Sequence, residues 1–245
     1  MITKANSGYF NYVSTCGNVS LTAFDYADFL KKMDALKKDV ENEFKPRVSM
    51  ELTKTEKIKV MGKFTKKIDK NSTILRSLHF NHEAKELVLT NGYLMLICSH
   101  DEGESQDLFY HAETAAKGIL VEDTSIEGKY PAYSKIIPDE SRYTERLRVN
   151  VPGWKQLCGK LKDYGKGHLS VKIKDGNIYS QAGDENILFE GFCELNQQAI
   201  LFNPEYLAEC LYFLSGKCEM LVGSEQISVM FKREKDTALL MRIRS

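Results

Sequence analysis

Histidines and acidic side chains are the residue types in this sequence that could perform acid–base chemistry or bind a metal. The chain has five histidines, at His79, His82, His100, His111 and His168. His79 and His82 lie three residues apart, and on a strand that spacing points two side chains to opposite faces. We interpret the histidines as surface or strand-end residues rather than metal ligands.

Other motifs of catalysis are absent from the sequence. The stretch Asp101–Asp107 holds four carboxylates around Gly103 but lacks the spacing of a calcium loop, which favours a solvated loop. Ser215-Gly216-Lys217 lacks the glycine-rich sequence that precedes the lysine of a phosphate loop. The sequence shows no nucleophile elbow, zinc-protease motif or dinucleotide fingerprint. It therefore predicts a protein that is not an enzyme and that needs no cofactor and no metal.

The six cysteines are scattered and form no C-x-x-C pair, which fits neither a zinc site nor a disulfide framework. Cys98, Cys158 and Cys210 lie in apolar stretches, where a thiol behaves as a small hydrophobic group. We find no signal peptide and no apolar run of the roughly 20 residues that a membrane span needs. These features predict a protein of the reducing cytoplasm.

The charges are balanced overall but not along the chain. Lys+Arg and Asp+Glu both number 34. Between Lys45 and Arg76 ten basic residues face three acidic ones, whereas between Glu83 and Glu145 thirteen acidic residues face five basic ones. Such an asymmetry suits a polyanion-binding face on an otherwise acidic protein, or it reflects strands whose polar faces share a sign.

The elements that would position these residues follow a repeated order. Asn18–Phe24 alternates as a strand, and Asp25–Phe44 has the apolar spacing of a helix. The patterns then predict a series of strands and one hairpin around Asn91-Gly92, the strands within 47–53, 57–64, 74–81, 86–99, 106–113 and 117–123.

The second half of the chain repeats this order of strand, helix and strands. We predict helices at Pro152–Gly165 and Asn203–Gly216, a hairpin at Asp175-Gly176, and strands at 147–151, 168–183, 185–195, 218–223, 227–233 and 237–244. The fold class is then α+β, with two similar domains that each pack helices on one face of an antiparallel sheet. We divide the chain into a first domain over 1–130, a connector over 131–146 and a second domain over 147–245.

Three stretches resemble the sliding clamp of bacteria, the beta subunit of DNA polymerase III. They are "LVLTNGYLMLI" (87–97), the connector "EGKYPAYSKIIP" (127–138), and "FNPEYLAECLYFLSG" (202–216) with the terminal "ALLMRIRS" (238–245). Residues 147–245 match a whole last domain, residues 71–146 match part of the preceding one, and the first 70 residues match only in outline. The resemblance implies two DNA-clamp-like domains in a short relative of the family.

In that family, the corresponding stretches line a groove that binds short hydrophobic peptides of polymerases and other partners. Carried over by position, the peptide-binding groove comprises Thr90, Gly92, Tyr93, Leu94, Pro131, Lys135, Ile136, Leu239, Met241 and Ile243. Apolar walls of this kind suit a peptide anchor, but the same residues would also seal a seam between two domains.

The sequence departs from the family pattern at several of these positions. Asn91 replaces an aspartate in the turn, and Ala132 and Ser134 replace an aspartate and a basic residue in the connector. Arg242 stands where the family has a proline, and Ser245 where it has a leucine.

The resemblance also implies a ring around duplex DNA, with lysines that attract phosphates without reading bases. Candidate DNA-facing lysines are Lys31, Lys32, Lys37 and Lys38 on the first helix, and Lys155, Lys160 and Lys162 on a later one; a solvated helix face is the alternative. The helix 203–216 carries Glu205 and Glu209 and is a poor DNA face. By domain count a six-domain ring needs three copies, which predicts a homotrimer.

Two functions therefore stand. The first is a sliding-clamp-like processivity factor that tethers a DNA polymerase or other partners to duplex DNA, independently of base sequence. The alternative is a clamp-fold binding or adaptor protein that binds peptides but does not form a ring or load onto DNA. An enzyme is the third possibility and would need a polar pocket that the sequence does not reveal.

Overall fold

The structure is a computed structural model that describes residues 2–4, 10–13, 20–23, 31, 51–101, 105–180, 187–194 and 199–243. The chain divides into two compact units, Met1–Val48 and Ser49–Ser245. The division predicted from the sequence, at residues 130 and 147, stays a prediction. The described residues contain no helix with the length and apolar character needed to span a membrane.

The first unit contains a three-stranded antiparallel sheet of order β1-β2-β3. Its strands are β1 (Ile2–Lys4), β2 (Phe10–Val13) and β3 (Ser20–Ala23). The strand predicted near residue 20 is confirmed by β3. The predicted helix Asp25–Phe44 lies outside the described residues except for Lys31, which is helical.

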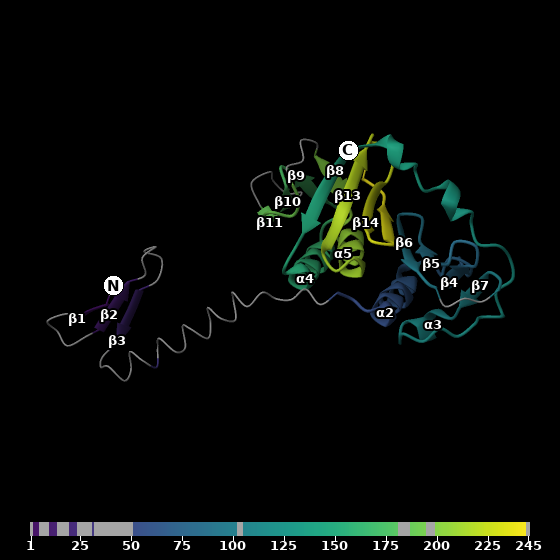
Figure 1. The fold of residues 1–245 in the computed structure, drawn as a ribbon, viewed down its shortest axis with the longest axis horizontal. Coiled ribbons are helices and arrows are strands. Elements are labelled where there is room, and N and C mark those ends of the chain that lie inside the picture. The colour runs from purple at the N-terminus through teal and green to yellow at the C-terminus, as the bar shows by residue number, and fades with distance from the viewer. Residues whose placement is uncertain are drawn as a thin grey trace. The chain divides into compact units, whose positions relative to one another are not determined.

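The second unit is built around an eight-stranded antiparallel sheet of order β7-β4-β5-β6-β15-β14-β13-β8 (Figure 1). Strands from the two parts of this unit meet in its middle, where Leu240 of β15 pairs with Leu94 of β6. The strands are β4 (Leu78–Asn81), β5 (Glu86–Thr90), β6 (Leu94–Ser99), β7 (Leu108–Tyr110), β8 (Tyr143–Asn150), β13 (Lys217–Gly223), β14 (Val229–Arg233) and β15 (Asp236–Leu240).

The described part of residues 143–240 contains the order strand, helix, three strands twice, and the two copies exchange their first strands. β8 precedes helix α4 (Trp154–Gly165) but pairs with β13, and β12 precedes helix α5 (Pro204–Phe213) but pairs with β9. The second sheet therefore has the order β11-β10-β9-β12. Its strands are β9 (Val171–Lys174), β10 (Asn177–Ser180), β11 (Ile187–Phe189) and β12 (Ile200–Phe202).

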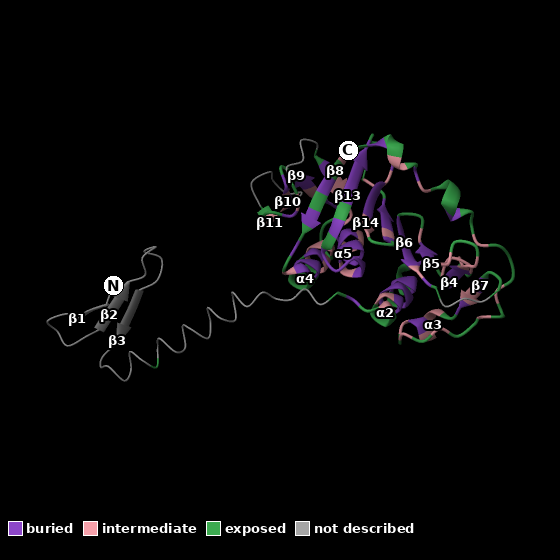
Figure 2. Ribbon diagram, viewed as in Figure 1, coloured by how far each residue is buried: buried purple, intermediate pink, exposed green. Residues whose placement is uncertain are grey.

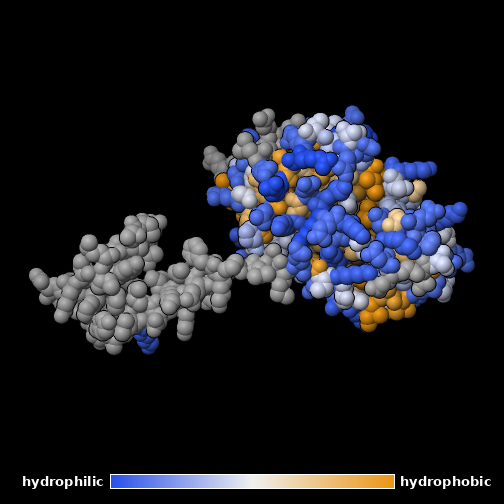
Figure 3. Space-filling model, in the orientation of Figure 1, coloured by the Kyte–Doolittle hydropathy of each residue, from blue (hydrophilic) through white to orange (hydrophobic). Residues whose placement is uncertain are grey.

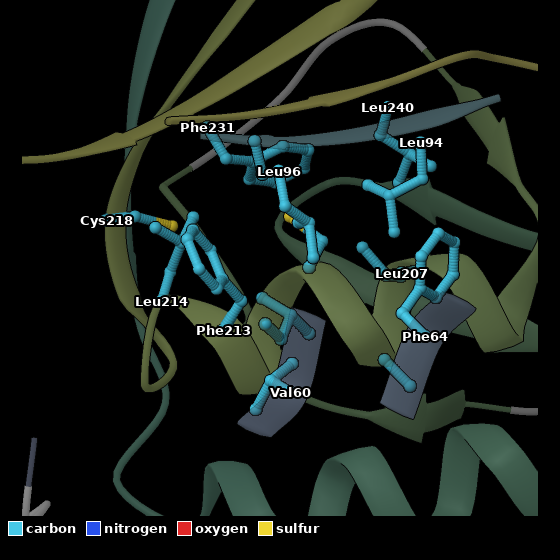
Figure 4. Packing of buried hydrophobic residues seen from close by; sticks show 14 of the residues in the cluster. Val60, Phe64, Leu94, Leu96, Leu207, Phe213, Leu214, Cys218, Phe231 and Leu240 are labelled. Carbon is cyan, nitrogen blue, oxygen red and sulfur yellow. The ribbon is translucent and has the colours of Figure 1, made fainter. Parts of the chain in front are cut away.

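Alternation along the strands gives the large sheet two apolar faces. Leu94 and Leu96 belong to the main core with the helices, whereas the intervening Met95 lies in a second cluster on the opposite face. In the main core, Val60 and Phe64 of α2 (Lys54–Phe64) pack with residues of α5, β6, β14 and β15 (Figure 4). One continuous core thus joins the parts of the unit that precede and follow the connector.

The prediction of a strand at 57–64 was wrong, because these residues form helix α2. Thr53 and Glu56 make a capping box: the Glu56 amide donates to Thr53 Oγ1 at 3.3 Å, and the Thr53 amide donates to Glu56 Oε2 at 2.8 Å. Lys57 and Lys59 alternate with apolar residues, which is the pattern of a strand. However, Ile58, Met61 and Phe64 are three residues apart and all buried, which is the spacing of one helix face.

Three further strand predictions were wrong or only partly right. Residues 117–123 form no strand but one bridge, between Glu122 and Tyr110, after the short helix α3 (Ala112–Ala115). The segment before β4 is a turn in which the Arg76 amide donates to the Ser72 carbonyl, so that the strand begins only at Leu78. In the described part of the predicted strand 47–53, residues 51–53 are not a strand, because Thr53 caps α2.

The helices and hairpins of the second half are confirmed. Asn203 caps α5 by accepting hydrogen bonds from the amides of Glu205 and Tyr206, at 3.0 and 3.1 Å. The Asp175-Gly176 hairpin joins β9 to β10, with positive φ at both turn residues.

Candidate functional site

The turn between β5 and β6 is held by the side chain of Asn91. Its Oδ1 accepts hydrogen bonds from the amides of Tyr93 and Leu94, at 2.9 and 2.8 Å. Thr90 Oγ1 accepts from the Gly92 amide at 3.1 Å and donates to the Leu94 carbonyl at the same distance. Gly92 has φ of +87°, a conformation that favours glycine. Asn91 therefore supplies an amide oxygen that accepts both hydrogen bonds.

The connector packs against the face of the large sheet that points away from the helices. Tyr130, Tyr133 and Ile137 join the second apolar cluster there. Tyr133 donates its hydroxyl to Glu86 Oε2 at 3.0 Å, and the Tyr130 ring stacks on His79 with centroids 4.5 Å apart. The apolar residues of this connector thus cover a sheet that both parts of the unit share.

The C-terminal segment continues from β15 past the same turn. The Met241 amide donates to the Tyr93 carbonyl at 2.9 Å, and the Ile243 amide donates to the Leu201 carbonyl of β12 at 2.9 Å. Met241 therefore lies beside the β5–β6 turn, and Ile243 beside the second sheet.

These three segments enclose a pocket of about 390 Å³, which we call the junction groove. Eight of the ten groove residues predicted from the sequence line it, namely Thr90, Gly92, Tyr93, Leu94, Pro131, Ile136, Leu239 and Met241. Tyr93 is 61% exposed, Ile136 60% and Met241 48%. Three large apolar side chains thus meet solvent around one pocket, which is an unusual concentration for a surface without a partner.

The other two predicted groove residues lie outside this lining. Lys135 is exposed on the short helical turn η2 (Tyr133–Lys135), next to Ile136. Ile243 instead lines a smaller pocket of about 190 Å³ with Arg242, Glu225 and Lys172. This second pocket follows the junction groove along the C-terminal segment.

Seven residues of the junction groove were not predicted: Leu75, Met95, Pro138, Arg142, Gln226, Ile227 and Ser228. Pro138 belongs to the connector motif and could have been included. Residues 226–228 form the loop between β13 and β14, which no local pattern links to the turn at Asn91. They reach the groove because Val229 pairs with Leu240, the residue before Met241.

The predicted DNA-facing lysines fall into three groups. Lys31 is exposed, whereas Lys32, Lys37 and Lys38 lie outside the described residues. On α4, Lys155 and Lys160 are exposed. Lys162 is half-buried and forms an ion pair with Glu209 Oε1 at 3.1 Å, so its charge is already neutralised within the protein.

The sequence analysis missed the lysines of α2 because it placed a strand there. Lys59 and Lys63 of α2 line a pocket of about 380 Å³ together with Lys162, Glu209 and Tyr212 of α4 and α5. We call the surface formed by Lys59, Lys63, Lys155, Lys160 and Lys162 the helical face. Hydrophilic side chains cover much of the surface over these helices (Figure 3).

Helix α5 contributes little to this face because it lies between the other two helices. It packs against both α2 and α4, and none of its residues is exposed (Figure 2). Its acidic residues are paired: Lys67 Nζ lies 2.9 Å from Glu205 and 3.2 Å from Glu209. Partial burial lowers the pKa of Lys67, but the hydrogen bond to Glu205 and the charge of Glu209 outweigh it and raise the pKa overall.

Several groups with catalytic potential are buried or paired. Burial raises the pKa of four thiols to about 12, which keeps them protonated: Cys98, Cys158, Cys193 and Cys218. His111 Nδ1 lies 2.9 Å from Asp123 at the surface. Within the described residues no group of three histidines, cysteines or carboxylates could hold a metal.

The fold class defined by this architecture is that of the sliding clamps. No family model and no curated protein sequence matches the chain. Solved structures do match: the DNA polymerase III beta subunit of Borrelia burgdorferi has a TM-score of 0.54 at 16% identity, over 99% of this chain and 76% of that one. The beta chain of Streptococcus pneumoniae has a TM-score of 0.57 at 15% identity, over 100% and 75%.

The DNA polymerase sliding clamp of Pseudomonas aeruginosa is similar, with a TM-score of 0.55 at 12% identity over 100% of this chain and 76% of that one. This chain therefore has the fold of the DNA polymerase III beta subunit. The predicted α+β clamp-like fold is confirmed. The sequence identities to these structures are low and support a shared fold only.

Proposed function

We propose that this protein is a sliding-clamp-like processivity factor. In this role the helical face attracts the phosphates of duplex DNA, and the junction groove binds a hydrophobic peptide segment of a DNA polymerase or another partner. The protein performs no reaction of its own and acts in the cytoplasm. Each chain would supply two clamp-like domains, residues 1–130 and 147–245. A ring of six such domains would then be a homotrimer.

The observation that carries the proposal is the position of the two surfaces on one sheet. Met95 and Leu239, which line the junction groove, belong to the face of the large sheet that points away from the helices. The lysines of α2 and α4 lie on the helical side. A protein that holds DNA on one side and a partner on the other needs this separation, because neither ligand then blocks the other.

The charge of the helical face supports loose binding. Lys59, Lys63 and Lys160 make no ion pair within the described residues, whereas Lys67 and Lys162 are paired with the carboxylates of α5. Lysines bind phosphates without base contacts and with strong salt dependence, which suits movement along DNA.

The same pairing favours a second candidate, a clamp-fold adaptor that binds peptides without encircling DNA. Neutralisation of Lys67 and Lys162 leaves fewer positive charges than the sequence suggests. In this case the junction groove would bind peptides without any DNA binding by the protein, and the helical face would be an ordinary solvated surface.

Three measurements separate the candidates. Sedimentation equilibrium gives the oligomeric state, and retention on nicked circular DNA, lost when the circle is cut, reports encirclement. Fluorescence anisotropy with short apolar peptides reports groove binding, which Met241→Asp should abolish. A trimer retained on circles supports the processivity factor, and a monomer that binds peptides but no circles supports the adaptor. If Met241→Asp leaves the peptide affinity unchanged, the junction groove is not the peptide-binding site in either candidate function.

A further inference from the structure

The lining of the junction groove contains one charged residue, Arg142. The other fourteen lining residues are apolar, glycine, or uncharged polar side chains such as Thr90, Gln226 and Ser228. No carboxylate lines the groove in the described part of the chain. A bound peptide would therefore meet apolar walls and a single guanidinium.

The carboxylates nearest to Arg142 in the sequence are engaged elsewhere. Asp139 caps the short helical turn η3 (Glu140–Arg142) by accepting from the Ser141 amide at 2.8 Å. Glu140 accepts a hydrogen bond from Arg146 at 2.6 Å and another from Lys232. The Lys232 hydrogen bond, followed by that of Arg146, lowers the pKa of Glu140 and keeps it ionised. Arg142 itself forms no ion pair with any residue that the structure describes.

The main chain of Arg142 is fixed while its side chain is exposed. Its amide donates to the Asp139 carbonyl at 3.0 Å. Its carbonyl oxygen lies against Gly223, where an added Cβ would come within 2.6 Å of that oxygen. The backbone of Arg142 is thus held at the edge of the groove, and its exposed side chain is accessible to a ligand.

The surroundings of the groove add to the positive charge. Lys135 lies in the connector beside Ile136. Arg242 donates a hydrogen bond to the Gly223 carbonyl at 2.8 Å. Burial lowers the pKa of Arg242, and the charges of Glu225, which lines the smaller pocket, and Glu145 offset this only in part. The rim of the groove is therefore cationic overall.

We propose that the partner segment of the junction groove carries a carboxylate next to its apolar anchor, and that Arg142 recognises this carboxylate. The inference rests on the proposed function of the groove and specifies its ligand: an apolar peptide with an adjacent aspartate or glutamate. Arginine suits this role because its planar guanidinium can pair with both oxygens of a carboxylate.

The test uses fluorescein-labelled hexapeptides with a Leu-Leu anchor and one variable flanking residue, aspartate, asparagine or lysine, on either side. Binding to the full chain is measured by anisotropy. We expect the aspartate peptide to bind about three- to tenfold more tightly than the asparagine peptide, the range of a partly exposed charge-assisted contact. Arg142→Gln should remove this preference, Arg142→Lys should retain part of it, and the lysine peptide should bind most weakly.

Arg148→Gln is the matched control, because Arg148 is an exposed arginine of β8 outside the junction groove. It should leave the aspartate preference unchanged. Equal binding of the aspartate and asparagine peptides, or a preference that survives Arg142→Gln, would overturn the role of Arg142 and leave the groove in place. If Met241→Asp does not weaken any of the peptides, or if none of them binds, the proposed groove and the role of Arg142 both fall.

Discussion

The amide of Met241 donates a hydrogen bond to the carbonyl oxygen of Tyr93, 2.9 Å away, and so extends the β15–β6 ladder beyond its last pair, Leu240 and Leu94. This contact joins the C-terminal segment to a turn that precedes it by about 150 residues. Both side chains lie at the rim of the junction groove, so the shape of the groove depends on the conformation of the turn.

Asn91→Ala should loosen this turn, because the amides of Tyr93 and Leu94 lose their shared acceptor. We expect the free energy of unfolding to fall by about 1–2 kcal/mol, measured by urea denaturation. Peptide affinity for the groove should fall as well. Asn91→Asp keeps both acceptor contacts and serves as the control; equal losses in the two variants would contradict this explanation.

Asp236→Ala should destabilise the fold through the ion pair that Asp236 forms with Lys57. This pair joins α2 to β15, and Asp236 is buried while the Lys57 side chain is 20% exposed. Removing one partner leaves a partly buried charge, which costs about 2–4 kcal/mol.

The double variant Lys57→Met with Asp236→Leu removes both charges. It should recover much of the loss, because no unpaired charge remains. Urea denaturation of Lys57→Met, Asp236→Leu and the double variant gives the coupling free energy. A double variant that is less stable than Asp236→Ala would argue against an electrostatic origin.

The fold was predictable where local patterns and tertiary context agree. The cap at Asn203 and the hairpin at Asp175-Gly176 have strong local signals, and both elements formed as predicted. Helix α2 was missed because Lys57 and Lys59 alternate with apolar residues, although the capping box of Thr53 and Glu56 indicated a helix.

The candidate site was predictable only in part. Three of its segments carry a family resemblance, but the loop of Gln226 and Ser228 enters the groove through strand pairing that the local sequence does not encode. The pairing of Lys162 with Glu209 is equally hidden, because the two residues lie 47 positions apart on different helices. Charge counts along the chain therefore overestimate the positive charge of α4.

The helical face gives a prediction for DNA binding. Lys59→Gln with Lys63→Gln should weaken binding to duplex DNA uniformly across sequences. If each lysine contacts one phosphate, the slope of log affinity against log salt should decrease in magnitude by about 0.9 per lysine. Lys162→Gln is the matched comparison, because Glu209 already neutralises this lysine.

Anisotropy titrations of a labelled duplex at several salt concentrations measure these slopes. Lys162→Gln should change the slope less than either α2 substitution does. If all three lysines contribute equally, the ion pair with Glu209 does not withhold Lys162 from DNA. If none contributes, the helical face is a solvated surface and the adaptor is favoured.

His79 should make the stability of the fold depend on pH. It is buried, its ring stacks on Tyr130, and Asp107 Oδ2 lies 3.8 Å from its Nε2. Burial lowers the pKa of His79, and the charge of Asp107 offsets this only in part. The folded protein therefore holds the neutral imidazole, whereas the unfolded chain binds a proton below the ordinary histidine pKa of about 6.5.

The free energy of unfolding should consequently be highest above that pH and fall as the pH drops through it toward the lower pKa of the folded state. His79→Phe keeps an aromatic ring against Tyr130 but cannot titrate, so it should flatten this part of the profile. His168→Phe is the control, because His168 stacks on Tyr164 with centroids 4.1 Å apart but is exposed. Urea denaturation between pH 5 and pH 8 gives the profiles. A slope that His79→Phe leaves intact would assign the pH dependence to other groups, whereas its loss would show that the connector is docked on a neutral histidine.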